Sequence, residues 1–330
     1  TNMYDFNGKL LSSYVVNQDD NSDETPIVRA LTVNIYDAAG RLTDIKKTIN
    51  DKSATERTIV HNDYNELGQL KTKQLGLQET TPLETLDYDY NIRGWLKGIN
   101  EDYANGGSTT HSDGSDIYFG ASLWYNYGFS KNQLNGNIAG IRWRSKGDGE
   151  QRAYGFSYDN ANRLLKADFT QNDDGWGTTA GVDFSVGGMA ATATSGTTTI
   201  NNAIGYDANG NIMSMSQVGL KVNSSSLIDK MTYNYKNSEN SNQLLAVTED
   251  ASIGTTDNKL GDFTDKNRSL DDYDYDYNGN LKYDKNKGIA SITYNYLNLP
   301  KLITITNKGT IQYVYDAAGN KLQKIVTDNT

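Results

Sequence analysis

Histidine, cysteine and paired carboxylates are the side chains most often used for catalysis and metal binding, and here they are few or scattered. His61 and His111 are the only histidines, and both lie in polar, loop-like sequence. We therefore expect solvated loop residues rather than a catalytic pair or a metal site. The chain contains no cysteine, which excludes disulfides, thiol nucleophiles and thiolate metal sites. No nucleophile elbow, phosphate-binding loop or His-Glu-x-x-His motif occurs, so we predict no catalytic residue and no cofactor.

Carboxylates are plentiful, so a glycosidase pair cannot be excluded by counting, and a hydrolase stays a third alternative. Two acidic clusters, Asp19-Asp20-Asn21-Ser22-Asp23-Glu24 and Asp271-Asp272, could bind calcium, because hard cations prefer several oxygen ligands. Neither has the spacing of a recognised calcium loop, and solvated acidic loops are the favoured interpretation.

Aromatic residues mixed with Asn and Asp also make carbohydrate-binding surfaces, so glycans are a possible partner. The tryptophans that could act as stacking platforms are Trp95, Trp124, Trp143 and Trp176. Trp95 occupies a polar position of a turn and is expected to be exposed. Trp143 alternates with Ile141 and is expected to face the core.

Charge and hydropathy exclude several partners. The chain has 31 basic and 41 acidic residues, a net charge of −10 and no run of Lys or Arg, which disfavours nucleic acid and anionic membranes. No segment approaches the roughly 20 apolar residues of a membrane span. Thr1 to Leu10 resemble mid-domain sequence rather than a signal peptide. We expect an exported chain that begins and ends inside a repeat array.

One phrase recurs along the chain: Tyr, then Asp or Asn, two variable residues, usually Gly, a polar residue and an aliphatic residue. The clearest copies are Tyr36-Asp37-Ala38-Ala39-Gly40-Arg41-Leu42, Tyr64-Asn65-Glu66-Leu67-Gly68-Gln69-Leu70, Tyr90-Asn91-Ile92-Arg93-Gly94-Trp95-Leu96, Tyr158-Asp159-Asn160-Ala161-Asn162-Arg163-Leu164, Tyr206-Asp207-Ala208-Asn209-Gly210-Asn211-Ile212, Tyr275-Asp276-Tyr277-Asn278-Gly279-Asn280-Leu281 and Tyr315-Asp316-Ala317-Ala318-Gly319-Asn320-Lys321-Leu322. The last copy carries one extra residue before its leucine. Weaker copies begin at Tyr4 and Tyr294.

The phrase predicts a tight β-hairpin turn. Asp37 can accept a hydrogen bond from the backbone two residues on, and Gly40 supplies the left-handed residue of a type I turn with a G1 bulge. Tyr36 should then lie opposite Leu42, and the equivalent pair should touch in every copy. Leu31, Val33 and Ile35 have the opposite parity to Tyr36, which indicates either a bulge or a strand with both faces occupied.

Strands flank these turns, because apolar residues alternate with period two, as in Tyr154/Phe156/Tyr158 and Ile311/Tyr313/Tyr315. A single hairpin is marginally stable, so neighbouring hairpins must bury its aromatic face. We therefore predict an all-β fold: tandem hairpins in one continuous antiparallel array over residues 1–330, with no internal boundary. Asn100 to Gly120 and Gln171 to Asn201 are expected to be loops or irregular strands.

These segments resemble the Rhs or YD-repeat family. The residues that carry the resemblance are YDAAGRL (36–42), YNELGQL (64–70), YNIRGWL (90–96), LNGNIAGIRWRS (134–145), YGFSYDNANRLLKADF (154–169), YDANGNI (206–212), YNYLNLPKLI (294–303) and YVYDAAGNKL (313–322). The family includes bacterial Rhs effectors, cocoon subunits of insecticidal toxin complexes and teneurins. Its members wind a β-sheet into a hollow shell.

The resemblance implies a non-catalytic segment of such a shell in a secreted or cell-surface protein. Its implied partners are other segments of one long polypeptide, namely an Rhs core and a C-terminal effector or sorting domain. Family toxins carry a core motif of the Asp-Pro-x-x-Gly type and a self-cleaving aspartate; neither occurs here, so no cleavage residue is assigned. An adhesin or carbohydrate-binding fragment is the alternative function.

Overall fold

A computed structural model describes residues 1–17, 27–77, 81–172, 175–177, 182–187, 191–194, 197–200, 203–221, 224–237, 240–251, 253 and 261–329. The fold is all-β, built from consecutive antiparallel hairpins, as predicted. The chain forms two compact units, Thr1–Ala153 and Tyr154–Thr330, which are considered separately below.

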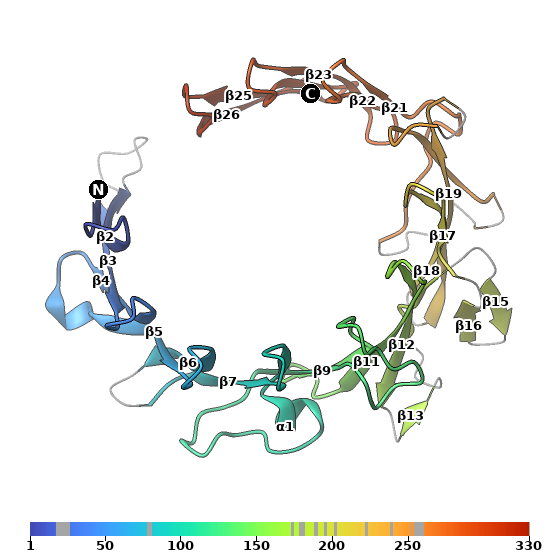
Figure 1. Cartoon of the computed structure of the whole chain (residues 1–330). Helices are drawn as coiled ribbons and strands as arrows, with labels where there is room; N and C mark the ends of the chain where they lie inside the picture. The colour runs from blue at the N-terminus through green and yellow to red at the C-terminus, as the bar shows by residue number, and fades with distance from the viewer. Residues whose placement is uncertain are drawn as a thin grey trace. The chain divides into compact units, whose positions relative to one another are not determined.

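The first unit is a meander in which each strand pairs antiparallel with the next one along the chain. Its elements are β1 (Asn2–Tyr4), β2 (Leu10–Asn17), β3 (Val28–Tyr36), β4 (Leu42–Ile49), a 3₁₀ turn (Ser53–Thr55), β5 (Arg57–Tyr64), β6 (Leu70–Leu77), β7 (Glu84–Tyr90), β8 (Leu96–Ile99), α1 (Glu101–Ala104), β9 (Phe119–Trp124) and β10 (Gly140–Ser145). β11 (Gln151–Tyr158) spans the boundary between the units. Strands β2 to β9 follow a curved path (Figure 1).

The second unit contains two larger sheets. The first comprises β12 (Leu164–Asn172), β13 (Trp176–Gly177), β14 (Val186–Gly187), β17 (Gly205–Tyr206), β18 (Ile212–Lys221), β19 (Ser224–Tyr235) and β20 (Leu244–Glu249). The other is a six-stranded meander of β21 (Tyr273–Tyr275), β22 (Leu281–Asp284), β23 (Ile289–Tyr294), β24 (Pro300–Ile305), β25 (Gly309–Tyr315) and β26 (Lys321–Asp328). β15 (Ala191–Thr194) and β16 (Thr197–Ile200) form a separate hairpin.

Apolar burial is thin and local in both units. In the first, Tyr103 and Ala104 of α1 are buried, at 2% and 0% exposure. In the second, Val218, Ile228 and Ala246 are buried on neighbouring strands β18, β19 and β20. Most other strand residues are half-buried, because a single sheet layer leaves part of each side chain in contact with solvent. Lateral contacts between hairpins must therefore carry much of the stability.

The segment between β8 and β9, which the sequence predicts as loops or irregular strands, also contains one short helix. Helix α1 starts directly after Asn100, which has a left-handed backbone (φ +47°) and is 4% exposed. The Asn100 side chain donates to the Phe119 carbonyl at 2.9 Å and accepts from the Asp87 amide at 2.9 Å. A helix of four residues is too short to leave a 3.6-residue period in the sequence, so the pattern could not reveal it.

Candidate functional site

The recurring turn has the predicted G1 bulge, and the predicted bond to the side chain from the backbone two residues on is present, as from the Ala161 amide to Asp159 Oδ1 at 2.8 Å. In the copy that begins at Tyr36, the Gly40 amide donates to the Asp37 carbonyl at 2.9 Å, and the Asp37 amide donates to the Arg41 carbonyl at 2.9 Å. Gly40 has φ +79°, the left-handed value of a G1 bulge. The same pair of bonds closes the turns that begin at Asp5, Asn65, Asn91, Asp159, Asp207, Asp276, Asn295 and Asp316.

The turn carboxylate does more than the sequence indicates. The carboxylate of Asp37 accepts the Arg41 amide through Oδ1 at 2.8 Å and the Arg41 Nε through Oδ2 at 2.7 Å. The hydrogen bond from the Arg41 backbone amide has the largest effect on the pKa of Asp37 and the bond from the Arg41 side chain the next largest; both hold this pKa below its usual value. Asp159 repeats the arrangement with Arg163, and the asparagines Asn211, Asn280 and Asn320 replace arginine opposite Asp207, Asp276 and Asp316. The aspartates are therefore engaged in the turns.

Tyr36 lies opposite Leu42, as predicted, and a one-residue register shift separates Ile35 from Tyr36. The extra residue of that shift, Thr43, lies on β4, so the alternation of β3 is unchanged. Residues 29–34 of β3 are all half-buried, which favours a strand with both faces occupied over a bulge in β3. Equivalent pairs are Tyr4↔Leu10, Tyr64↔Leu70, Tyr90↔Leu96, Tyr206↔Ile212, Tyr275↔Leu281, Tyr294↔Pro300 and Tyr315↔Lys321.

The last copy does not contain the extra residue that the sequence indicates. Tyr315 pairs with Lys321 at the ordinary sixth position after the tyrosine, and Leu322 is the bulged residue, 65% exposed. The expectation that Leu322 takes the aliphatic position is wrong. The turn keeps its length, because the hydrogen bonds of Asp316 and the positive φ of Gly319 define it independently of which side chain follows.

Several motif tyrosines join their hairpin to the one before it. The Tyr64 hydroxyl donates to the Leu42 carbonyl at 2.8 Å, across two hairpins that are consecutive along the chain. Leu42 is the residue six positions after the tyrosine of the preceding motif. The same bond joins Tyr36 to Leu10, Tyr90 to Leu70, Tyr125 to Leu96, Tyr206 to Leu164, Tyr235 to Ile212, Tyr294 to Leu281 and Tyr315 to Pro300. We call this series the tyrosine ladder.

Basic side chains cover several ladder rings. The Arg41 guanidinium lies 4.6 Å from the centre of the Tyr64 ring, and that of Arg163 lies 4.7 Å from the centre of the Tyr206 ring. Arg163 also donates to the Asp207 carbonyl at 3.0 Å, so one side chain contacts its own turn and the next. Such cation–π contacts add about 0.5–1 kcal/mol at partly exposed sites.

Tyr125 and Tyr235 belong to the ladder although neither begins a recognisable motif copy.

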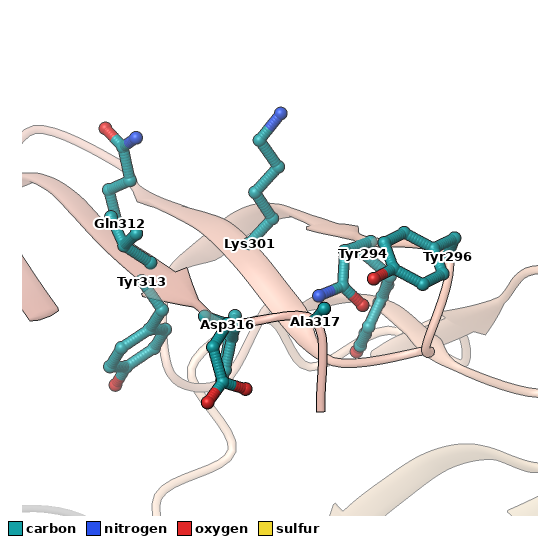
Figure 2. A pocket seen from close by; sticks show the side chains of 10 residues that line it. Tyr294, Tyr296, Lys301, Gln312, Tyr313, Asp316 and Ala317 are labelled. Carbon is teal, nitrogen blue, oxygen red and sulfur yellow. The ribbon is translucent and has the colours of Figure 1, made fainter. Parts of the chain in front are cut away.

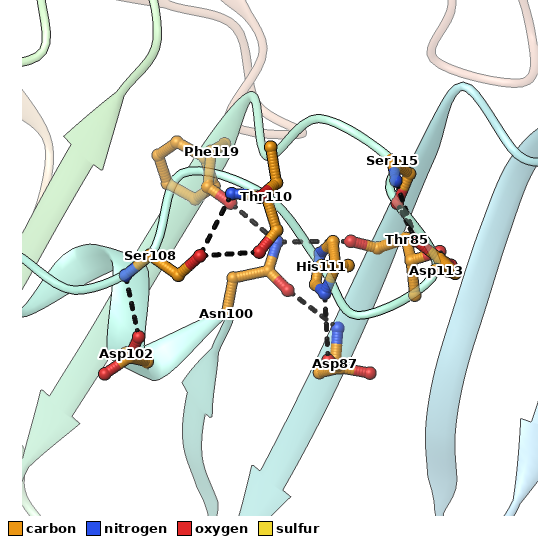
Figure 3. Close-up of polar contacts among 10 residues, drawn as sticks. All are labelled: Thr85, Asp87, Asn100, Asp102, Ser108, Thr110, His111, Asp113, Ser115 and Phe119. Carbon is orange, nitrogen blue, oxygen red and sulfur yellow. Dashed lines mark hydrogen bonds and ion pairs between the residues drawn. The ribbon is translucent and has the colours of Figure 1, made fainter.

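The two histidines are not the solvated loop residues that the sequence predicts. His61 lies in strand β5, and its Nδ1 is 2.7 Å from Asp44 on the neighbouring strand. His111 begins a further turn of the same kind, in which the Gly114 amide donates to its carbonyl at 3.0 Å. Its side chain is 10% exposed, and Nδ1 is 3.2 Å from Asp87 (Figure 3). Each histidine contacts an aspartate distant along the chain, Asp44 of β4 or Asp87 of β7, and no local sequence pattern indicates these contacts.

One group of carboxylates could hold a metal ion. Among the described residues, the carboxylate oxygens of Asp229, Glu249 and Asp262 lie within 4.8 Å of one another. The cluster Asp19-Asp20-Asn21-Ser22-Asp23-Glu24 lies outside the described residues. Asp271 pairs with Lys285, and Asp272, 0% exposed, accepts the Val247 amide at 2.8 Å. Asp272 is thus a buried structural acceptor rather than part of a solvated loop.

The aromatic candidates for glycan stacking differ in exposure. Trp95 is half-buried, with its ring centre 5.3 Å from that of Tyr125 and the Arg93 guanidinium 5.0 Å away, so the expected exposure is wrong. Trp143 is half-buried, and Trp176 is 41% exposed.

A hollow of about 670 Å³ lies elsewhere, between two turns of the six-stranded sheet. Its lining includes Tyr294, Tyr296, Lys301, Gln312 and Tyr313 (Figure 2). Lys301 and Gln312 point the same way, and Tyr296 is 79% exposed. Exposed aromatic and polar groups thus meet in this hollow rather than at the tryptophans.

Comparison with solved structures identifies the architecture. The crystal structure of TcdB2-TccC3 matches 99% of this chain with a TM-score of 0.58 at 14% identity. The chain shares its fold with TcdB2-TccC3. A TcdB2-TccC3-Cdc42 structure matches 98% of the chain with a TM-score of 0.56 at 15% identity, and a Photorhabdus luminescens Tc holotoxin pore matches 98% with a TM-score of 0.56 at 14% identity.

The chain spans only about 15% of the length of TcdB2-TccC3-Cdc42 and of the holotoxin chain, and 16% of TcdB2-TccC3. No family model and no curated protein matches the sequence. The resemblance to YD-repeat shells that the motifs indicate is therefore confirmed at the level of the fold. No helix among the described residues is long and apolar enough to cross a bilayer.

Proposed function

We propose that this chain is a non-catalytic segment of a YD-repeat shell, whose task is to build wall that encloses or displays another part of a larger protein. The single observation that carries the proposal is the tyrosine ladder. In it, a single tyrosine side chain joins a hairpin to an earlier one, as in the Tyr64 to Leu42 bond of 2.8 Å. A wall extended by repeating one contact needs no active site.

Two further features support this role. The match to TcdB2-TccC3 covers 99% of the chain, so the similarity extends over the whole array and not over one motif. Carboxylates that a hydrolase would need are occupied elsewhere. Asp37 and Asp159, for example, are each hydrogen-bonded within their own turn. The partners we propose are other segments of the same long polypeptide and an effector that it encloses, in a secreted or surface protein.

Electron microscopy of the purified polypeptide that contains this chain tests the proposal. We expect a curved wall one sheet thick, with density from another part of the protein on its concave side. A compact globule without a curved sheet would refute the shell function. Turnover of a glycan or peptide substrate that a single carboxylate substitution abolishes would replace it with a hydrolase.

Carbohydrate binding is the second candidate, and the hollow beside Tyr296 favours it. Tyr296, Lys301 and Gln312 line the same hollow, which therefore offers a stacking surface and hydrogen-bond donors. Glycan-array binding of the chain and of Tyr296→Ala is the test, with Tyr277→Ala as the control because Tyr277 is a fully exposed tyrosine at another turn tip. Binding that Tyr296→Ala alone removes supports this function, whereas no binding to any glycan refutes it.

A further inference from the structure

One face of the neighbouring strands β4 and β5 carries a histidine between two carboxylates. Asp44 lies directly opposite His61, and Asp63 follows His61 two residues along β5, so the three side chains leave the sheet on the same side. The side chains of Asp44, His61 and Asp63 are 23%, 34% and 60% exposed. A dissolved ion can therefore reach this group, which we call the His61 cluster.

The two ring nitrogens of His61 have different surroundings. Nδ1 is 2.7 Å from Asp44 Oδ1, and because a carboxylate only accepts hydrogen bonds, the proton of the neutral ring lies on Nδ1. Nε2 then carries the lone pair of the ring. Asp63 Oδ1 is 3.5 Å from Nε2, which is too long for a hydrogen bond. A lone pair and a carboxylate oxygen thus face each other, an arrangement that a cation between them stabilises.

The separation of these two atoms fits two ligands of one metal ion. Bonds of about 2.0–2.1 Å at a tetrahedral angle place a nitrogen and an oxygen ligand about 3.3 Å apart. The Thr72 hydroxyl donates to Asp63 Oδ2 at 3.0 Å, so the other carboxylate oxygen of Asp63 holds this outer bond. His61 and Asp63 therefore each have an outer hydrogen bond that fixes their orientation, as the ligands of protein metal sites usually do.

We propose that His61 Nε2 and Asp63 Oδ1 bind a divalent transition-metal ion of the zinc type. Asp44 and Thr72 are positioning residues, which hold the two ligands through Nδ1 and Oδ2. The imidazole ligand favours zinc over calcium and magnesium, which prefer oxygen ligands. Water completes the coordination, because the site is open to solvent. The inference does not depend on the shell function.

His111 provides a matched control within the same chain. Its Nδ1 is 3.2 Å from Asp87, so it also has a carboxylate partner (Figure 3). Its side chain is only 10% exposed, and its Nε2 atom is buried. A hydrated ion does not reach that nitrogen, so His111→Gln should leave zinc binding unchanged.

Isothermal titration calorimetry of the full chain with zinc chloride tests the site. Millimolar calcium is present throughout, because it competes for groups made of oxygen ligands alone. We expect a single zinc ion to bind per chain, and His61→Gln and Asp63→Asn to weaken binding by more than the loss of an outer partner does. Asp44→Asn should weaken it about tenfold, the effect typical of such a partner. Far-ultraviolet circular dichroism checks that each variant keeps the parent fold.

Nitrogen-15 NMR of the two imidazole rings, at a pH where both are neutral, gives an independent readout. Zinc should shift Nε2 of His61 and leave both nitrogens of His111 unchanged. Before zinc is added, the parent should carry the His61 proton on Nδ1. Asp44→Ala should give a mixture of the two tautomers, which a merely structural role of Asp44 would not produce.

The absence of saturable zinc binding, or equal zinc affinity of the parent and His61→Gln, overturns the inference and leaves the His61 cluster as an ion pair only. An equal loss of affinity in His111→Gln overturns it as well, because the ion would then bind elsewhere. If His61→Gln does not fold, Asp63→Asn decides, since it keeps the shape of the side chain and removes its charge.

Discussion

Removing one ladder hydroxyl should destabilise the sheet that contains it by a measurable amount. The Tyr294 hydroxyl donates to the Leu281 carbonyl at 2.8 Å, and this bond is partly buried. Tyr294→Phe keeps the ring and deletes the donor. A hydrogen bond of this kind contributes about 1 kcal/mol, and for a unit of this length that loss lowers the melting temperature by about 2–4 °C.

Tyr296 provides the matched control two residues along the chain. It is 79% exposed, and its ring lies at the turn tip rather than on the neighbouring hairpin. Tyr296→Phe should leave the melting temperature of the second unit within about 1 °C of the parent value. Thermal unfolding followed by far-ultraviolet circular dichroism and by calorimetry compares the three proteins. Equal shifts for the two variants would refute the claim that the ladder bond stabilises the sheet.

Three further predictions concern the turns and the titration of the sheet. Gly279 has φ +83°, and a Cβ at this position would meet no other atom. Gly279→Ala should therefore lower the free energy of unfolding by about 1–2 kcal/mol through backbone strain alone, as measured by urea unfolding. Gly279→Asn should lower it less, because Asn162 adopts φ +63° at the equivalent position. Hydrogen bonds from Asn280 lower the pKa of Asp276. The Asp276 carboxylate therefore contributes its full stabilisation above about pH 4 and loses it as the pH falls through the lowered pKa. Asp276→Asn should reduce the change in melting temperature between about pH 5 and about pH 2.5. Burial raises the pKa of Tyr233 to about 12. The neutral Tyr233 side chain therefore contributes its full stabilisation below about pH 10 and loses it as the pH rises through about 12. A Tyr233→Phe variant should lose less stability than the parent between about pH 9 and about pH 12.

Equal costs for alanine and asparagine at Gly279 would show that positive φ is not the source of the strain. An unchanged acid transition in Asp276→Asn would remove that carboxylate from the pH response. An unchanged alkaline transition in Tyr233→Phe would do the same for the phenol.

The geometry of each motif turn follows from the residues of that turn. Asp37 and Gly40 act over four residues, and a turn with these residues at these positions pairs Tyr36 with Leu42 whatever surrounds it. For this reason the hairpins, the G1 bulges of their turns and the all-β class could be predicted without coordinates. The extra residue assigned near Leu322 was wrong because the pattern was aligned on a leucine, whereas the turn's hydrogen bonds set the register.

Contacts between hairpins could not be predicted in the same way, since they join residues far apart along the chain. The Tyr206 hydroxyl reaches Leu164 across 42 positions, and His61 meets Asp44 across 17. The lengths of the intervening strands and loops vary, so no fixed sequence spacing identifies these partners. The sequence alone determined that the motif hairpins form and where their own tyrosines lie, but it did not mark Tyr125 and Tyr235 as members of the ladder. Only the tertiary structure decided what that tyrosine contacts, because the acceptor is a backbone carbonyl, which every residue has and no side chain marks.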